Sequence, residues 1–240
     1  MQNIWNTLFY QPIYNSLIFT INNITFGDVG FAIIIITILV KIILFPLTKK
    51  SIMTQIMLKK MEPELKSIKK DFPNKEEQAK KTFELYKKYG TNPFSGLFVV
   101  LLQLPIIFAL YYVFYKGLPL GNGPLYSFVS APGVLKENFL GLIDMHGKSL
   151  FLALLAGITQ FIQGYLSQPI IPKKEGLQNE KKTFQEEMAH SMQINIKYIL
   201  PIFIAFIAYK ISAAIALYWV VSNLCTIGQE WYIRNKITSQ

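Results

Sequence analysis

The chain has 240 residues, of which 52% are apolar or aromatic and only 16% are charged. Soluble domains carry about 25% charged residues, so this composition excludes a disordered chain and disfavours a soluble two-domain enzyme. The one cysteine, Cys225, excludes an intrachain disulfide and a cysteine-rich metal site. The net charge of +10 is concentrated in residues 48–92, which hold twelve lysines and six acids.

Five apolar runs follow one another along the chain, and each predicts a membrane-spanning helix. The expected spans are 30–47, 93–116, 149–167, 194–209 and 211–233. A core helix could explain any single run, but not five in a chain of this length. The predicted fold is therefore an all-α integral membrane protein, with a five-helix transmembrane bundle.

The placement of lysine predicts the orientation of this bundle. Residues 1–30 contain no Lys or Arg, whereas 48–92 and 168–193 are rich in lysine and 117–148 is poor in it. Because basic loops stay on the cytoplasmic side, we expect the N-terminus outside, an outer loop at 117–148, a cytoplasmic loop at 168–193 and a short cytoplasmic tail at 234–240.

Residues 1–29 combine aromatic and aliphatic side chains with scattered amides. This pattern predicts an amphipathic helix on the outer membrane interface, with an uncleaved anchor or an ordinary packing helix as the alternative.

The basic segment 48–92 predicts a helical hairpin on the cytoplasmic side. Pro73 breaks the pattern, Asn74 can cap a second helix, and Gly90 can end it. Its lysines are either a solvated surface or contacts for substrates, partners or lipid headgroups. The candidates are Lys59, Lys60, Lys66, Lys69, Lys70, Lys80, Lys81, Lys87 and Lys88.

Lys41 is the most informative residue, since it lies inside the first apolar run. A charge at that depth costs roughly 2.5–3.5 kcal/mol, so Lys41 either snorkels to the interface or faces a hydrated groove. The apolar runs contain no acidic residue, and the fifth of them ends at Gln229. Water or a transiently bound acidic group would therefore stabilise the charge of Lys41. The expected groove residues are Lys41, Gln103, Thr159, Gln160, Gln163, Tyr218, Trp219, Ser222, Asn223 and Gln229.

The motifs of enzymes are missing from the sequence. His146 and His190 fall outside the runs and have no ligand-spaced partners, so we expect both to be surface histidines. No nucleophile elbow, zinc-binding or phosphate-binding motif occurs. The sequence therefore predicts a protein that is not an enzyme and has no cofactor and no metal site.

Several segments together resemble the YidC/Oxa1/Alb3 family of membrane protein insertases, in its short bacterial form. They are 10–15, 41–47, 89–94, 103–111 and 217–223, with Gln229. The resemblance covers nearly the whole chain.

This resemblance implies an insertase or chaperone of the bacterial plasma membrane. It would move hydrophobic segments of nascent proteins from the cytosol into the bilayer, through a hydrated groove with a positive charge and without nucleotide hydrolysis. The implied partners are nascent membrane proteins and the lipid bilayer, with the Sec translocon, the signal recognition particle receptor and the ribosome as further candidates. Direct recognition of nucleic acid is not expected.

Lys41 departs from the family pattern, because the family usually has arginine at this position. Lysine is a point charge and lacks the fork of donors of arginine. Two alternatives stay open: a small transporter or channel for an anionic solute, and a non-catalytic membrane assembly factor. The chain has no internal repeat of the kind common in transporters.

Overall fold

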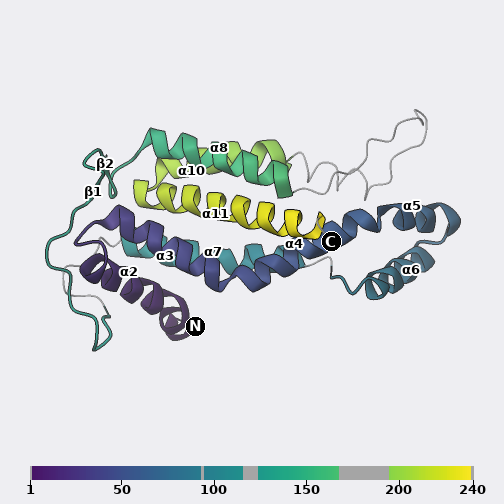
Figure 1. The fold of residues 1–240 in the computed structure, drawn as a ribbon, viewed down its shortest axis with the longest axis horizontal. Helices are drawn as coiled ribbons and strands as arrows, with labels where there is room; N and C mark the ends of the chain where they lie inside the picture. The colour runs from purple at the N-terminus through teal and green to yellow at the C-terminus, as the bar shows by residue number, and fades with distance from the viewer. Residues whose placement is uncertain (1, 93–94, 116–123, 168–194, 239–240) are drawn as a thin grey trace.

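The computed structural model describes residues 2–92, 95–115, 124–167 and 195–238. They form a mostly helical, elongated molecule, which agrees with the predicted helical class (Figure 1). Its elements are α1 (Gln2–Trp5), the π-helical turn η1 (Asn6–Tyr10), α2 (Gln11–Asn23), α3 (Val29–Ile43), α4 (Phe45–Lys60), α5 (Glu62–Asp71), α6 (Lys75–Lys88), α7 (Ser95–Tyr115), β1 (Asn138–Phe139), β2 (Ile143–Asp144), α8 (Leu150–Ser167), the π-helical turn η2 (Asn195–Ile199), α10 (Leu200–Lys210) and α11 (Ala213–Thr238). The predicted loop 168–193 and residues 117–123 of the predicted outer loop lie outside the described residues.

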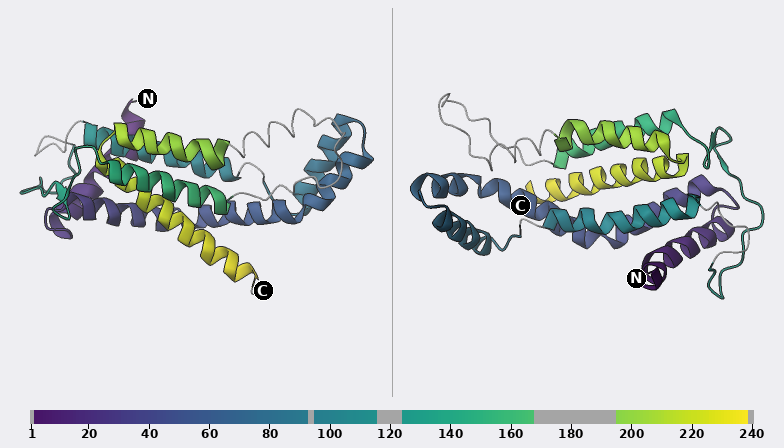
Figure 2. Two further views of the ribbon diagram at one scale, coloured as in Figure 1. Left: turned by 90° about the horizontal axis from the view of Figure 1, so that it is seen from above. Right: turned by 180° about the vertical axis from the view of Figure 1, so that it is seen from behind.

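Helices α8, α10 and α11 pack together along one side of the molecule, and α11 also packs against α3 (Figure 1). Gly157 of α8 permits the close approach of α10, since a Cβ at this position would lie 2.8 Å from the Cβ of Ala205. Seen from above, the C-terminal part of α11 leans away from the bundle (Figure 2). The long helix α11 therefore joins the two sides of the bundle.

The first apolar run differs from its prediction, because it continues through a bend into a second helix. Helices α3 and α4 meet at Leu44 with an angle of 61°. Pro46, in the first turn of α4, has no N–H to continue a straight helical ladder. Residues 48–60, expected to belong to the basic hairpin, form most of α4, which packs against α7 and α11.

The N-terminal segment is a packing helix on one face. Tyr14, Leu17, Ile18 and Ile21 of α2 are fully buried, against α3 and α7. This burial fits the packing-helix alternative, while Phe19 on the other face stays exposed. An interfacial position of the exposed face remains a prediction.

A loop and a small hairpin cover the end of the bundle where α3 and α8 begin. Strands β1 and β2 pair antiparallel, with Phe139 opposite Ile143. Gly30 of α3 makes room for this hairpin, because a Cβ there would lie 2.2 Å from the ring of Phe139. The hairpin is thereby fixed to the helices.

Helices α5 and α6 form a hairpin that extends beyond the opposite end of the bundle (Figures 1 and 2). Asn74 caps α6, with its side chain accepting a hydrogen bond from the N–H of Glu76, as the sequence predicts. Met61 and Leu85 are buried at its base, whereas Phe83 is 60% exposed. The hairpin thus has a small core of its own.

Among the described helices, α8 alone is long and apolar enough to cross a membrane by itself. Helices α3 and α4 meet the same criteria together, as one bent span, and the apolar stretch Gln103–Phe114 of α7 is shorter. The arrangement of five spans remains a prediction.

Candidate functional site

Lys41 lies in the last turn of α3 and faces α11. Its ammonium Nζ donates a hydrogen bond to Thr226 Oγ1 at 3.0 Å, and Gln229 Nε2 donates to the carbonyl oxygen of Lys41 at 3.0 Å. The Lys41 carbonyl can accept this hydrogen bond because the last carbonyls of a helix have no N–H partner within the helix. Lys41 is half-buried, and no carboxylate of the described residues forms an ion pair with it. A cation with a neutral hydroxyl partner therefore sits between α3 and α11.

The other predicted groove residues of α11 divide between this face and the core. Thr226 Oγ1 in turn donates to the carbonyl of Ser222, a buried residue one turn earlier. Tyr218 is 2% exposed and Trp219 9% exposed, so both belong to the core. Gln103 lies half-buried on α7. The structure brings Gln229 and the Ser222–Thr226 turn to Lys41, but not the two aromatic residues.

Thr159 and Asn223 meet on a different face, between α8 and α11. Asn223 Nδ2 donates to Thr159 Oγ1 at 3.2 Å, and both side chains are buried. Such a contact joins two helices, as polar residues commonly do in membrane proteins. These two residues hold α8 against α11 and do not contact Lys41.

Gln160 and Gln163 belong to a chain of hydrogen bonds that the sequence analysis did not predict. Gln160 Nε2 donates to Gln163 Oε1, Gln163 Nε2 to Ser167 Oγ, and Ser167 Oγ to Glu230 Oε2 at 2.5 Å. The chain runs along α8 toward the end of α11, and not toward Lys41.

Glu230 lies within the predicted span 211–233, one residue beyond the apolar run that ends at Gln229. It is 1% exposed within α11 and accepts hydrogen bonds from Arg234 Nε at 2.9 Å and Nη2 at 2.7 Å. Arg234 also donates to the carbonyl of Leu166, near the end of α8. The i, i+4 spacing of Glu230 and Arg234 was the available signal, but the fifth run was taken to end one residue before Glu230.

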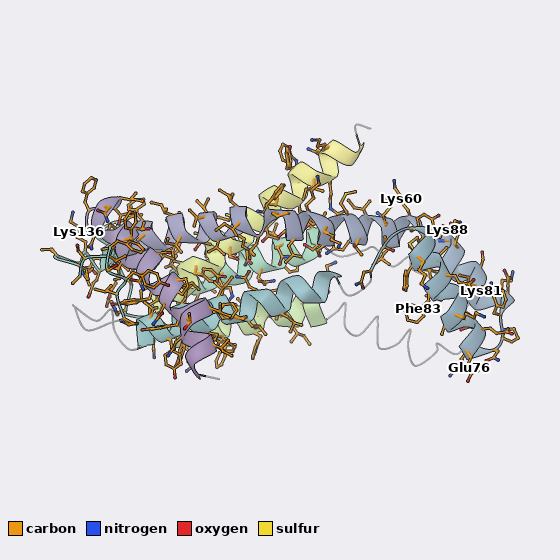
Figure 3. The ribbon with its side chains drawn as sticks, turned by 90° about the horizontal axis from the view of Figure 1, so that it is seen from below. Lys60, Glu76, Lys81, Phe83, Lys88 and Lys136 are labelled. Carbon is orange, nitrogen blue, oxygen red and sulfur yellow. The ribbon has the colours of Figure 1, made fainter. Side chains whose placement is uncertain are left out.

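The predicted hairpin lysines lie together at the far end of the molecule, where Figure 3 labels Lys60, Lys81 and Lys88. Among the lysines whose side chains the structure describes, three form ion pairs: Lys66 with Glu62 at 3.0 Å, Lys81 with Glu84 at 2.9 Å, and Lys88 with Glu64 at 2.9 Å. Other predicted lysines are exposed and form none of these pairs: Lys59, Lys60, Lys70, Lys80 and Lys87. Lys69 lies on α5.

Glu64 ties the two helices of the hairpin together. The Tyr89 hydroxyl and the Lys88 ammonium both donate to its carboxylate. These hydrogen bonds, that of Tyr89 first, lower the pKa of Glu64 below its ordinary value. The hairpin is therefore fastened by an exposed charged contact at neutral pH.

The comparison with protein families identifies the chain. Residues 20–240 match the family described as 60Kd inner membrane protein. The chain belongs to this family. Membership and the bacterial relatives described next indicate a bacterial inner membrane protein.

Several relatives carry the name "Membrane protein insertase YidC", among them proteins from two bacteria. The protein from Campylobacter jejuni is 34% identical over 234 residues, which cover 97% of this chain and 38% of the relative. The protein from Clostridium tetani is 33% identical over 201 residues, which cover 83% of this chain and 79% of the relative. The chain thus spans well under half of the first relative and most of the second.

A solved structure has a similar fold. It is titled "Active YidC insertase crystal structure with the first transmembrane domain resolved", and the match has a TM-score of 0.58 at 20% identity. The match covers 95% of this chain and 46% of the solved one. At this identity the likeness concerns the fold alone.

Proposed function

We propose that this chain is a membrane protein insertase. It helps hydrophobic segments of nascent membrane proteins pass from the cytosol into the bilayer, without nucleotide hydrolysis and without catalysing a covalent reaction. One observation carries the proposal: Lys41 sits in the apolar helix α3 with its ammonium on the hydroxyl of Thr226 and with no carboxylate partner among the described residues. The names of the relatives agree with it.

The charge of Lys41 stays available to a visiting acidic group. A hydroxyl partner orients the ammonium but does not neutralise it, and a half-buried positive charge attracts carboxylates more strongly than one fully exposed to water. Gln229 fixes the backbone that carries Lys41. An acidic residue near the polar end of a substrate would therefore be drawn to this face while its apolar segment enters the lipid.

The proposed groove follows the face of α11 that meets α3. Lys41, Ser222, Thr226 and Gln229 form its polar lining, with Gln103 on α7 as a further member. Thr159, Asn223, Gln160 and Gln163 support the wall formed by α8 and α11. Tyr218 and Trp219 support it from the core.

The proposed topology has five spans, with the N-terminus outside and the α5–α6 hairpin in the cytosol. The exposed lysines of the hairpin then face the substrate, anionic lipid headgroups or a partner. The Sec translocon, the signal recognition particle receptor and the ribosome are the candidate partners. The names of the relatives do not favour the two alternatives from the sequence, a transporter for an anionic solute and an assembly factor.

Complementation tests the proposal directly. A bacterium depleted of its own insertase would express the wild-type chain, Lys41→Ala, Lys41→Arg or Lys49→Ala at equal levels. Lys49→Ala is the matched control, because it removes an exposed lysine near the start of α4. We expect growth with the wild type, Lys41→Arg and Lys49→Ala, and impaired growth with Lys41→Ala. Full rescue by Lys41→Ala would contradict the role of the charge.

A further inference from the structure

Glu137, Asp144 and His146 come together at the end of the bundle opposite the α5–α6 hairpin. One ligand atom from each of these residues lies within 4.8 Å of the other two. The pairing of the β-hairpin produces the cluster: Asn138 stands opposite Asp144, and the N–H of Met145 donates to the carbonyl of Glu137 at 2.9 Å. The sequence analysis expected His146 to be an isolated surface residue, since sequence spacing does not show this pairing.

The imidazole of His146 is held in a defined position. Its ring packs edge-on against Phe114, with the ring centroids 6.0 Å apart, and its N–H on the main chain donates to Asp144 Oδ1 at 2.9 Å. Its Nδ1 atom is buried and has no hydrogen-bond partner among the described residues. The nearest carboxylate oxygen recorded for it, Glu137 Oε2, lies 3.6 Å away, too far for a hydrogen bond.

A buried nitrogen without a partner is costly, and a metal ion would supply what it lacks. One imidazole nitrogen and two carboxylate oxygens are ligands that Zn²⁺ accepts, with a fourth position left to water. Zinc bonds of about 2.0–2.2 Å place the ligand atoms of a tetrahedral site roughly 3.4 Å apart. Glu137 and Asp144 are exposed, so their carboxylates can rotate toward that spacing.

We propose that Glu137, Asp144 and His146 form a binding site for a divalent transition-metal ion of the Zn²⁺ type. The site would tie together the two ends of the β-hairpin, next to the segment that contacts the start of α11. The same segment already holds that helix, because Ala213 N–H donates to the carbonyl of Gly147 at 2.8 Å and Ala214 N–H to that of Met145 at 3.1 Å. This inference rests on the loop geometry alone and is independent of the proposed function.

The test measures Zn²⁺ binding by isothermal titration calorimetry on the full chain in lipid nanodiscs, purified through a tag without histidine and freed of metal by a chelator. We expect saturable binding of one Zn²⁺ per chain. His146→Ala should weaken it by more than about tenfold, while His190→Ala, which removes the other histidine of the chain, should leave it unchanged. Millimolar Mg²⁺ should not displace Zn²⁺, since Mg²⁺ prefers oxygen ligands alone.

A second variant guards against misfolding of His146→Ala. Glu137→Gln alters only an exposed side chain and should also lose Zn²⁺ binding. In thermal unfolding, Zn²⁺ should raise the midpoint of the wild type and of His190→Ala, but not that of Glu137→Gln. Absence of saturable binding, or equal affinity in the wild type, His146→Ala and Glu137→Gln, would overturn the proposal.

Discussion

The lysine of the helical bundle and the lysines of the α5–α6 hairpin carry the same charge in opposite surroundings. Lys41 is half-buried and is tied to α11 through Thr226 and Gln229. The hairpin lysines whose side chains the structure describes are exposed, and some form exposed pairs such as Lys88–Glu64. Screening by water and salt makes exposed charges weak and interchangeable. Lys41 should therefore matter individually, whereas the hairpin lysines should act as a group.

The largest expected effect separates the two regions directly. In insertion assays with reconstituted vesicles, Lys41→Ala should slow the insertion of a substrate with an acidic polar end by at least about tenfold. The reason is that two unit charges 4 Å apart attract by about 4 kcal/mol even at an effective dielectric constant of 20. Lys87→Ala, in the hairpin, should slow it by less than about twofold. Equal insertion rates for Lys41→Ala and Lys87→Ala would contradict the individual role of the Lys41 charge.

The second effect concerns the buried polar contacts of the bundle. Arg234→Ala leaves the carboxylate of Glu230 buried without its charged partner. We expect a loss of about 3 kcal/mol in the free energy of unfolding, the lower end of the range for breaking a buried pair, because the Arg234 side chain is 35% exposed. Denaturant unfolding of the purified protein measures this loss.

A double variant distinguishes the unpaired charge from lost packing. Adding Glu230→Gln to Arg234→Ala removes the buried charge and should restore part of the stability. If the double variant were less stable than Arg234→Ala, packing of the arginine would be the cause.

A smaller effect is expected at the cap of α6. Asn74→Ala removes the side chain that accepts from the N–H of Glu76, which should cost about 1 kcal/mol. Hydrogen–deuterium exchange should become faster in the first turn of α6 and stay unchanged in α8. Lys75→Ala, an exposed neighbour, is the control and should change neither region.

The smallest effect is a pH dependence of the hairpin. The pKa of Glu64 is lowered, first by the Tyr89 hydroxyl and then by Lys88, so its contact stabilises the hairpin above the ordinary carboxyl pKa. This stabilisation is lost as the pH falls from about 5 through the lowered pKa. Spin-label distances between α5 and α6 should therefore broaden on acidification.

The control for this pH effect is Glu64→Gln. Its α5–α6 distances should change much less between neutral and acid pH. The pKa of Glu84 is also lowered, mainly by Lys81, but this pair lies within α6 and does not join the two helices. Equal broadening in the wild type and in Glu64→Gln would rule out the Glu64 contact as the cause.

Local sequence signals predicted the break between α5 and α6 but not the one between α3 and α4. Pro73 and Asn74 define the turn between α5 and α6 because they act on the neighbouring backbone. The bend between α3 and α4 was not predicted, although Pro46 marks it. Its angle and the burial of Thr48 and Ile52 depend on α7 and α11, which the sequence does not place beside α4.

The candidate site was predicted in part for a similar reason. Helical spacing shows that residues share a face, but the helix packed against that face decides their partners. Thr159 and Asn223 therefore meet each other and not Lys41. Glu230 was missed because it lies one residue beyond the fifth apolar run, and only its contacts with Ser167 and Arg234 explain its burial.

Cross-linking through the native cysteine tests the central claim most directly. Cys225 adjoins Thr226 on α11 and lies within electrostatic reach of Lys41. A stalled ribosome–nascent chain carrying one cysteine beside its apolar segment would be offered to the wild type. The control is a Cys225→Ser variant with Phe203→Cys on the exposed side of α10. We predict cross-links to Cys225 and few to position 203, and cross-links at position 203 without any to Cys225 would contradict the proposed path of the substrate.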